Sequence, residues 1–62
     1  MNLIKVKNKM CQLEMTQNDL AREVGVHYST VYRWLSGERK PLLRNKIKIA
    51  DALEITVEEL ES

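Results

Sequence analysis

The stretch GVHYSTVYRWLSG, residues 25–37, places two glycines around a short segment with two different faces. Successive residues on a helix turn by about 100°. Counted from Tyr28, one arc of roughly 140° holds polar and aromatic side chains: Tyr28, Ser29, Tyr32, Arg33 and Ser36. A separate arc, at roughly 240° to 340°, is apolar: Val31, Trp34 and Leu35. The pattern predicts a helix from about Tyr28 to Ser36, with Trp34 in the core.

The polar arc has an unusual composition for a solvated helix face. Such a face normally carries Lys, Glu and Gln, which are good helix formers. Tyrosines, serines and one arginine instead donate, accept and stack, and the planar fork of arginine matches the guanine edge in a DNA major groove. We interpret this arc as a binding surface, although the two tyrosines could simply be exposed.

A second helix is predicted immediately before this segment. Thr16 is a typical N-cap, and Asp19 follows at the capping-box spacing. Its inward stripe contains Leu20, Ala21 and Val24. Gly25 ends it by adopting the left-handed conformation. Two short helices joined by a glycine turn meet the requirements of a helix-turn-helix, whose second helix protrudes far enough to enter the major groove.

Three further helices complete an all-α fold. The first, Leu3–Leu13, presents a stripe of Leu3, Val6 and Met10, with Cys11 beside it as a small buried hydrophobe. The fourth, Leu43–Leu53, is expected to bury Ile47, Ala50 and Leu43. The last is a single turn, with Thr56 and Glu59 as a second capping box and Val57 and Leu60 inward. No segment has the alternation of a strand.

Size and composition bound the class of protein. A chain of 62 residues forms one domain, residues 1–62, with marginal stability. The single cysteine excludes an internal disulfide, and one His with one Cys cannot make a zinc site, so we expect no metal and no cofactor. No catalytic constellation is recognisable, so we do not expect an enzyme. No signal peptide or membrane span is predicted, and a single free thiol fits the cytoplasm.

The charge is strongly polarised along the chain. Residues 1–50 hold all ten basic residues against four acidic ones, which gives +6, whereas residues 51–62 hold five acidic residues and no base. Residues 33–48 alone carry six bases against Glu38. This asymmetry is compatible with a positive face toward a polyanion, although charges also simply solvate exposed faces.

The segment TQNDLAREVGVHYSTVYRWLSGERKP resembles the helix-turn-helix of the phage repressor and Cro-type regulators, also called the xenobiotic-response-element type. KIADAL and TVEEL resemble the fourth and fifth helices of that family. The resemblance covers nearly the whole chain. It implies a compact five-helix, lambda-repressor-like DNA-binding domain from a phage or prokaryote, with the helix-turn-helix at helices 2 and 3.

The resemblance also implies roles for individual residues. The base-contacting positions would be Tyr28, Ser29, Tyr32 and Arg33. The contacts to the DNA backbone would come from Gln17, Asn18, His27, Ser36, Arg39, Lys40 and Arg44. His27 stands where many members have a Ser or Thr cap, and Tyr28 and Ser29 replace the usual Gln or Arg, so the base code of relatives does not transfer. Met10 and Leu35 replace an Arg–Glu pair of several phage members and are predicted to touch.

The apolar residues near the C-terminal end exceed what one helical turn buries. We therefore expect a homodimer interface that includes Leu42, Leu43, Ile55, Val57 and Leu60. Such a dimer would set two recognition helices about one DNA turn apart. The predicted function is a sequence-specific double-stranded DNA-binding regulator, a repressor or Cro-like switch, with no small-molecule ligand evident. The alternative is an antitoxin or adaptor that uses the same fold to bind another protein.

Overall fold

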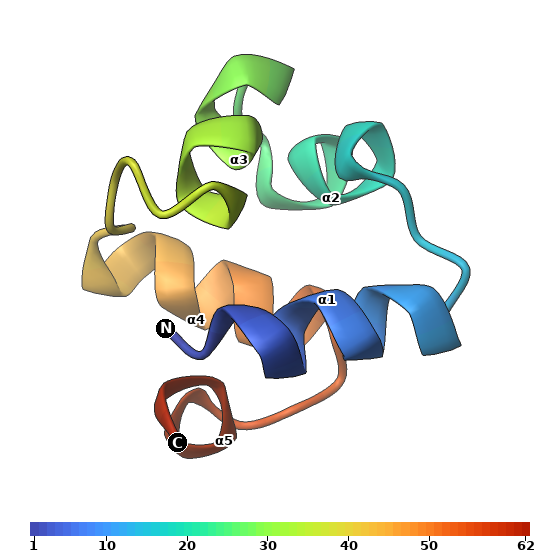
Figure 1. Ribbon diagram of the computed structural model, residues 1–62, viewed down its shortest axis with the longest axis vertical. Coiled ribbons are helices and arrows are strands. Elements are labelled where there is room, and N and C mark those ends of the chain that lie inside the picture. The colour runs from blue at the N-terminus through green and yellow to red at the C-terminus, as the bar shows by residue number, and fades with distance from the viewer.

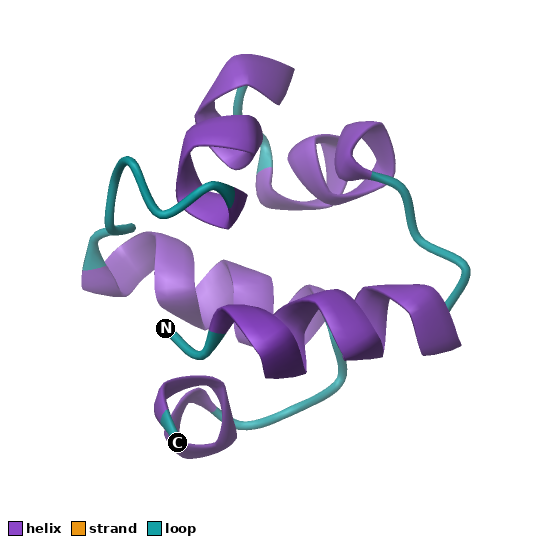
Figure 2. Ribbon diagram, viewed as in Figure 1, coloured by secondary structure: helices purple, strands orange, loops and turns teal.

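The computed structural model covers residues 1–62 and contains five α-helices and no strand (Figures 1 and 2). The helices are α1 (Leu3–Gln12), α2 (Gln17–Val24), α3 (Tyr28–Leu35), α4 (Leu43–Ala52) and α5 (Val57–Glu61). The all-α prediction and the order of the five helices are confirmed, with ends that differ by a residue or two. None of these helices has the length and apolar character needed to cross a membrane.

The predicted start of α2 is confirmed in full. The Thr16 hydroxyl accepts the backbone N–H of Asp19 at 3.1 Å, and the Asp19 carboxylate accepts the backbone N–H of Thr16 at 3.0 Å. The hydrogen bonds from Thr16, together with the neighbouring Arg22, lower the pKa of Asp19. At α5 only half of the predicted box forms: Thr56 accepts the N–H of Glu59 at 3.1 Å, without a return bond from the Glu59 side chain.

The junctions α1–α2 and α4–α5 share one geometry that the sequence analysis missed. Both have the pattern Leu-Glu-apolar-Thr, residues 13–16 and 53–56. In each, the glutamate lies in the left-handed region, with φ of 54° at Glu14 and 61° at Glu54. The next residue donates its N–H to a carbonyl five residues back: Met15 to Met10 at 2.8 Å, and Ile55 to Ala50 at 2.9 Å. This is a Schellman helix end, built twice with glutamate where glycine is usual.

The core is one cluster of twelve buried side chains contributed by all five helices. On α4 the inward residues are Ile49 and Ala50, followed by Leu53, and all are at most 2% exposed. The prediction that Leu43 and Ile47 are buried is wrong, because they are 64% and 53% exposed. Helix α4 has apolar residues around most of its circumference, so the pattern permits two inward faces, and packing on α2 and α5 selects the face with Ile49.

Four other side chains test the predicted core. Trp34 is 4% exposed, as predicted. Cys11 is exposed, so the prediction of a buried thiol is wrong; it lies beside the inward stripe of α1 rather than on it. Met10 and Leu35 are both buried in the same cluster and both line one surface hollow, which is compatible with the predicted contact between them; the contact itself stays a prediction.

The packing order places α3 at one end of the molecule. Helix α2 packs against both α3 and α4, and α4 in turn packs against α5. Along the longest axis, α3 lies at the top and α5 at the bottom (Figure 1). The acidic residues of α5 are therefore at the end of the molecule away from α3.

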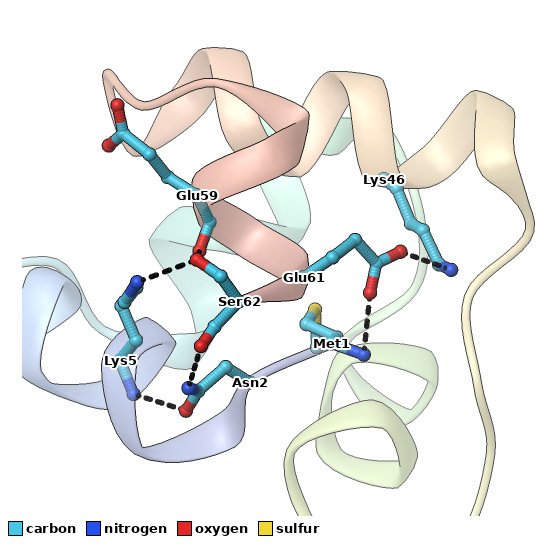
Figure 3. A network of polar contacts seen from close by, with 7 residues as sticks. All are labelled: Met1, Asn2, Lys5, Lys46, Glu59, Glu61 and Ser62. Atoms are coloured by element: carbon cyan, nitrogen blue, oxygen red, sulfur yellow. Dashed lines mark hydrogen bonds and ion pairs between the residues drawn. The ribbon is translucent and has the colours of Figure 1, made fainter.

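Polar contacts tie α5 to the first residues of the chain and to α4 (Figure 3). The Glu61 carboxylate pairs with the Met1 amino group at 3.1 Å and with Lys46. The hydrogen bond from Lys46 makes the largest contribution to lowering the pKa of Glu61, and the hydrogen bond from the Met1 amino group makes the next largest. Asn2 caps α1 and also donates to the Ser62 carbonyl oxygen at 3.0 Å. Lys46 is therefore engaged with α5 and is not a free base of the 33–48 segment.

Candidate nucleic-acid interface

The candidate interface is the outer face of α3, whose two faces are as separate as the sequence predicted. Val31 is 0% exposed and Leu35 is 4% exposed. On the other side, Tyr28 and Tyr32 are 44% and 54% exposed, and half of the Arg33 side chain is exposed. Ser29 is half-buried and Ser36 is exposed. The rest of the chain therefore leaves the side chains of Tyr28, Tyr32 and Arg33 accessible.

The turn before α3 sets the direction of this helix. Gly25 has φ 84° and ψ 35°, and its N–H donates to the Ala21 carbonyl at 2.8 Å, which ends α2. Val26 donates to the same carbonyl at 3.0 Å and packs against the core. Ala21 itself is 5% exposed where α2 and α3 meet, and its small size permits their close approach.

His27 is the N-cap of α3, which resolves the question raised by the absence of Ser or Thr at this position. Its Nδ1 accepts the backbone N–H of Ser29 at 3.1 Å and lies 2.8 Å from the Ser29 hydroxyl oxygen. At the other end, the Ser36 hydroxyl donates to the Arg33 carbonyl at 3.1 Å. Both serines of the predicted surface are thus hydrogen-bonded within the chain.

Arg33 has an acidic neighbour that the sequence analysis did not pair with it. Its Nε lies 3.6 Å from the Glu38 carboxylate, and both side chains are more than half exposed. An exposed pair of this kind contributes little to stability, so Arg33 can readily leave Glu38 and bind another anion. The guanidinium therefore remains available, with Glu38 as a local competitor.

The structure brings four of the seven predicted backbone-contacting residues together in two hollows, one that includes the first residue of α3 and one that includes Arg33. Asn18, at the start of α2, shares a hollow with His27 and Tyr28. Arg39 and Lys40 share a second hollow with Arg33. Arg44 is exposed on the first turn of α4. Gln17 is half-buried and lines a different hollow with Met10 and Leu35.

Three polar residues adjoin the candidate interface without having been predicted. Arg22 lines the hollow of Asn18 and Tyr28 and pairs with Asp19. Thr30 and Asn45 line the hollow that contains Arg33. The signal for Arg22 was its spacing of four residues from Asn18, which places both on one face of α2. Thr30 carried no comparable signal.

The predicted dimer residues fall into three classes. Leu42 and Leu43 are 61% and 64% exposed, and Ile47, one turn after Leu43, is 53% exposed; these three exposed apolar residues at the N-terminal half of α4 are called the strip below. Ile55 and Val57 are partly buried against the core. Leu60 is 0% exposed, so its inclusion in an interface is wrong. Its side chain is fully buried in the core of its own domain and has no accessible surface for contact with a partner.

The fold and this exposed helix define a helix-turn-helix domain, and comparison with known proteins agrees. A helix-turn-helix family model matches residues 6–60, and the chain belongs to this family, the DNA-binding regulators of the Cro and C1 type. The chain is similar to the cryptic phage CTXphi transcriptional repressor RstR of Vibrio cholerae serotype O1, with 38% identity over 56 residues. That alignment covers 90% of this chain and 50% of RstR, so the chain spans about half the length of this relative. No solved structure matches.

Proposed function

We propose that the protein is a sequence-specific double-stranded DNA-binding repressor or Cro-like switch that inserts α3 into the major groove. The observation that carries the proposal is the exposed face of α3, where Tyr28, Tyr32 and Arg33 stand opposite a fully apolar face. An eight-residue helix at one end of the molecule has the dimensions to enter a groove about 12 Å wide. The similarity to a transcriptional repressor supports repression as the outcome of binding.

Base reading is assigned to the exposed face of α3: Tyr28, Ser29, Tyr32 and Arg33. Backbone contacts are assigned to residues around this face: Gln17, Asn18, His27, Ser36, Arg39, Lys40 and Arg44. Among the first set, Arg33 offers two parallel donors to a guanine edge. Among the second, Arg39 and Lys40 supply charge to phosphates, so each contact releases counterions and steepens the dependence of affinity on salt.

The test begins with selection of bound duplexes from a random pool, followed by mobility shifts at rising salt. Arg33→Ala should lose about 1–3 kcal/mol of discrimination at one base position. Arg39→Ala should weaken binding to all sequences alike and lower the salt slope by about 1. Lys9→Ala, in the hollow between α1 and α5 that contains none of the residues assigned to DNA, is the control for loss of a positive charge and should do neither.

The outcomes separate the candidate functions. If Arg33→Ala leaves the relative affinities for operator variants unchanged, α3 is not the reading element. If the wild-type chain binds duplex DNA without the steep counterion slope, or not at all, the protein-binding alternative is favoured.

We further propose that two copies associate through the exposed Leu42, Leu43 and Ile47, and that the partly buried Ile55 and Val57 contribute to the same interface. More than half of each strip side chain is exposed, and burial between copies would remove this apolar area from water. A symmetric contact of this kind would present two α3 helices to one face of the duplex. Sedimentation should show a dimer on DNA that Leu43→Asp abolishes; a wild-type monomer both free and on DNA would refute it.

A further inference from the structure

The hydrogen bonds of the His27 imidazole determine the state of the neighbouring Ser29 hydroxyl. The backbone N–H of Ser29 donates to His27 Nδ1 at 3.1 Å. A backbone N–H can only donate, so Nδ1 must be the ring nitrogen without a proton, and the proton of the neutral ring is on Nε2. The lone pair of Nδ1 thus points at the start of α3.

The same Nδ1 lies 2.8 Å from the Ser29 hydroxyl oxygen, and this distance fixes the direction of that hydrogen bond. Because Nδ1 carries no proton, the hydroxyl must donate its own to the same lone pair, which the backbone N–H at 3.1 Å and the closer hydroxyl at 2.8 Å share. No other partner of this hydroxyl lies within hydrogen-bonding distance. Ser29 therefore directs its one proton toward His27 and presents only lone pairs to the outside.

This polarity has a chemical consequence at a base edge. In the major groove, adenine N6 and cytosine N4 are donors, whereas guanine O6 and thymine O4 are acceptors. A freely rotating serine hydroxyl can hydrogen-bond to either a donor or an acceptor. A serine hydroxyl whose proton is already donated to a neighbour can hydrogen-bond only to a donor.

We propose that His27 is a positioning residue for sequence recognition, which makes Ser29 an acceptor and thereby selects adenine or cytosine over guanine or thymine at the base that Ser29 faces. The proposal rests on the proposed DNA-binding function. A hydroxyl cap at position 27 would satisfy the backbone N–H of Ser29 equally well. Such a hydroxyl can also donate to the Ser29 oxygen, so it would not fix the direction of the bond as the unprotonated Nδ1 does, and the imidazole has a consequence beyond capping.

The first test examines the free protein and needs no DNA. Long-range 1H–15N correlation spectra at pH 8, where an ordinary imidazole is neutral, report which ring nitrogen of His27 carries the proton. We expect the proton on Nε2, with the Nδ1 resonance altered in Ser29→Ala. A proton on Nδ1 would overturn the proposal whatever the protein binds.

The second test compares duplexes selected from a random pool by the wild type, Ser29→Ala and His27→Ser. Ser29→Ala should lose about tenfold discrimination at a single position of each half-site, where the wild type prefers adenine or cytosine. His27→Ser, which keeps a capping hydroxyl, should accept guanine or thymine at that same position. A purely structural role of His27 would weaken binding without changing the base.

The proposal is overturned if His27→Ser selects the same base as the wild type, or if Ser29→Ala changes no position. Circular dichroism confirms that each variant is folded, and His27→Thr replaces His27→Ser should the latter unfold. If the wild type enriches no sequence at all, the proposed DNA-binding function is refuted together with this inference. If the wild type and His27→Ser both enrich sequences with the same base at this position, only the inference about His27 is refuted.

Discussion

Replacing Glu54 by glycine should make the protein more stable, although it removes a whole side chain. Glu54 has φ 61° at the end of α4, and its exposed side chain makes no hydrogen bond or ion pair. An L-residue in the left-handed region costs about 1–2 kcal/mol. Glycine avoids this strain but loses about 0.5–1 kcal/mol more backbone entropy on folding. The net gain is about 0.5–1 kcal/mol.

This gain is measurable against the whole stability of so small a domain. At roughly 0.05–0.15 kcal/mol per residue, 62 residues correspond to about 3–9 kcal/mol. A gain of about 0.5–1 kcal/mol raises the Tm by about 2–8 °C. Thermal and urea unfolding, followed by circular dichroism at about 222 nm, should show the shift without a change in the slope with urea.

A matched variant separates backbone strain from charge. Glu54 also places a negative charge at the C-terminal end of α4, where the helix dipole disfavours it. Glu54→Gln removes the charge and keeps the strain. Glu14→Gly, at the equivalent place after α1, should give a similar gain that adds to the first. The reasoning is refuted if Glu54→Gly is no more stable than Glu54→Gln.

Three further predictions concern the core, acid stability and the interface. Leu60→Ala should cost about 2–5 kcal/mol in urea unfolding, against less than about 0.5 kcal/mol for the exposed Leu42→Ala; equal costs would contradict the assigned packing. Because the folded-state pKa of Asp19 is lowered, its contribution is present above its usual value of 3.8 and is lost as pH falls; the Tm advantage over Asp19→Asn should therefore shrink below about pH 4, and a constant difference would exclude this account. Glu38→Gln should tighten DNA binding by no more than about fivefold in mobility shifts, because it frees Arg33 from an exposed ion pair; weaker binding would mean that Glu38 holds Arg33 in its reading position.

The local signals in the sequence predicted most of the fold. The cap at Thr16, the turn at Gly25 and the two faces of α3 depend on backbone chemistry within a few residues, and all three were predicted. The inward face of α4 was not, because Leu43, Ile47 and Ile49 are equally apolar and only tertiary packing decides between them. The burial of Leu60 likewise depends on contacts made elsewhere in the domain.

The candidate interface was predictable in its position and less so in its details. The helical arc identified Tyr28, Tyr32 and Arg33 as exposed, since exposure follows from the period of the helix. The pairing of Arg33 with Glu38 and the hydrogen bond between His27 and Ser29 depend on side-chain rotamers, which the sequence does not specify. Whether these residues bind DNA stays a prediction.

The division of α3 into two faces has a consequence for how such a protein can change over generations. The side chains that pack α3 against the core, such as Val31 and Trp34, are different from the solvent-exposed ones, such as Tyr28 and Tyr32. Substitutions at the exposed positions therefore change the free energy of unfolding little, whereas they can change the choice of binding partner strongly. A lineage built on this scaffold can acquire a new target by a few surface exchanges, without passing through unfolded ancestors.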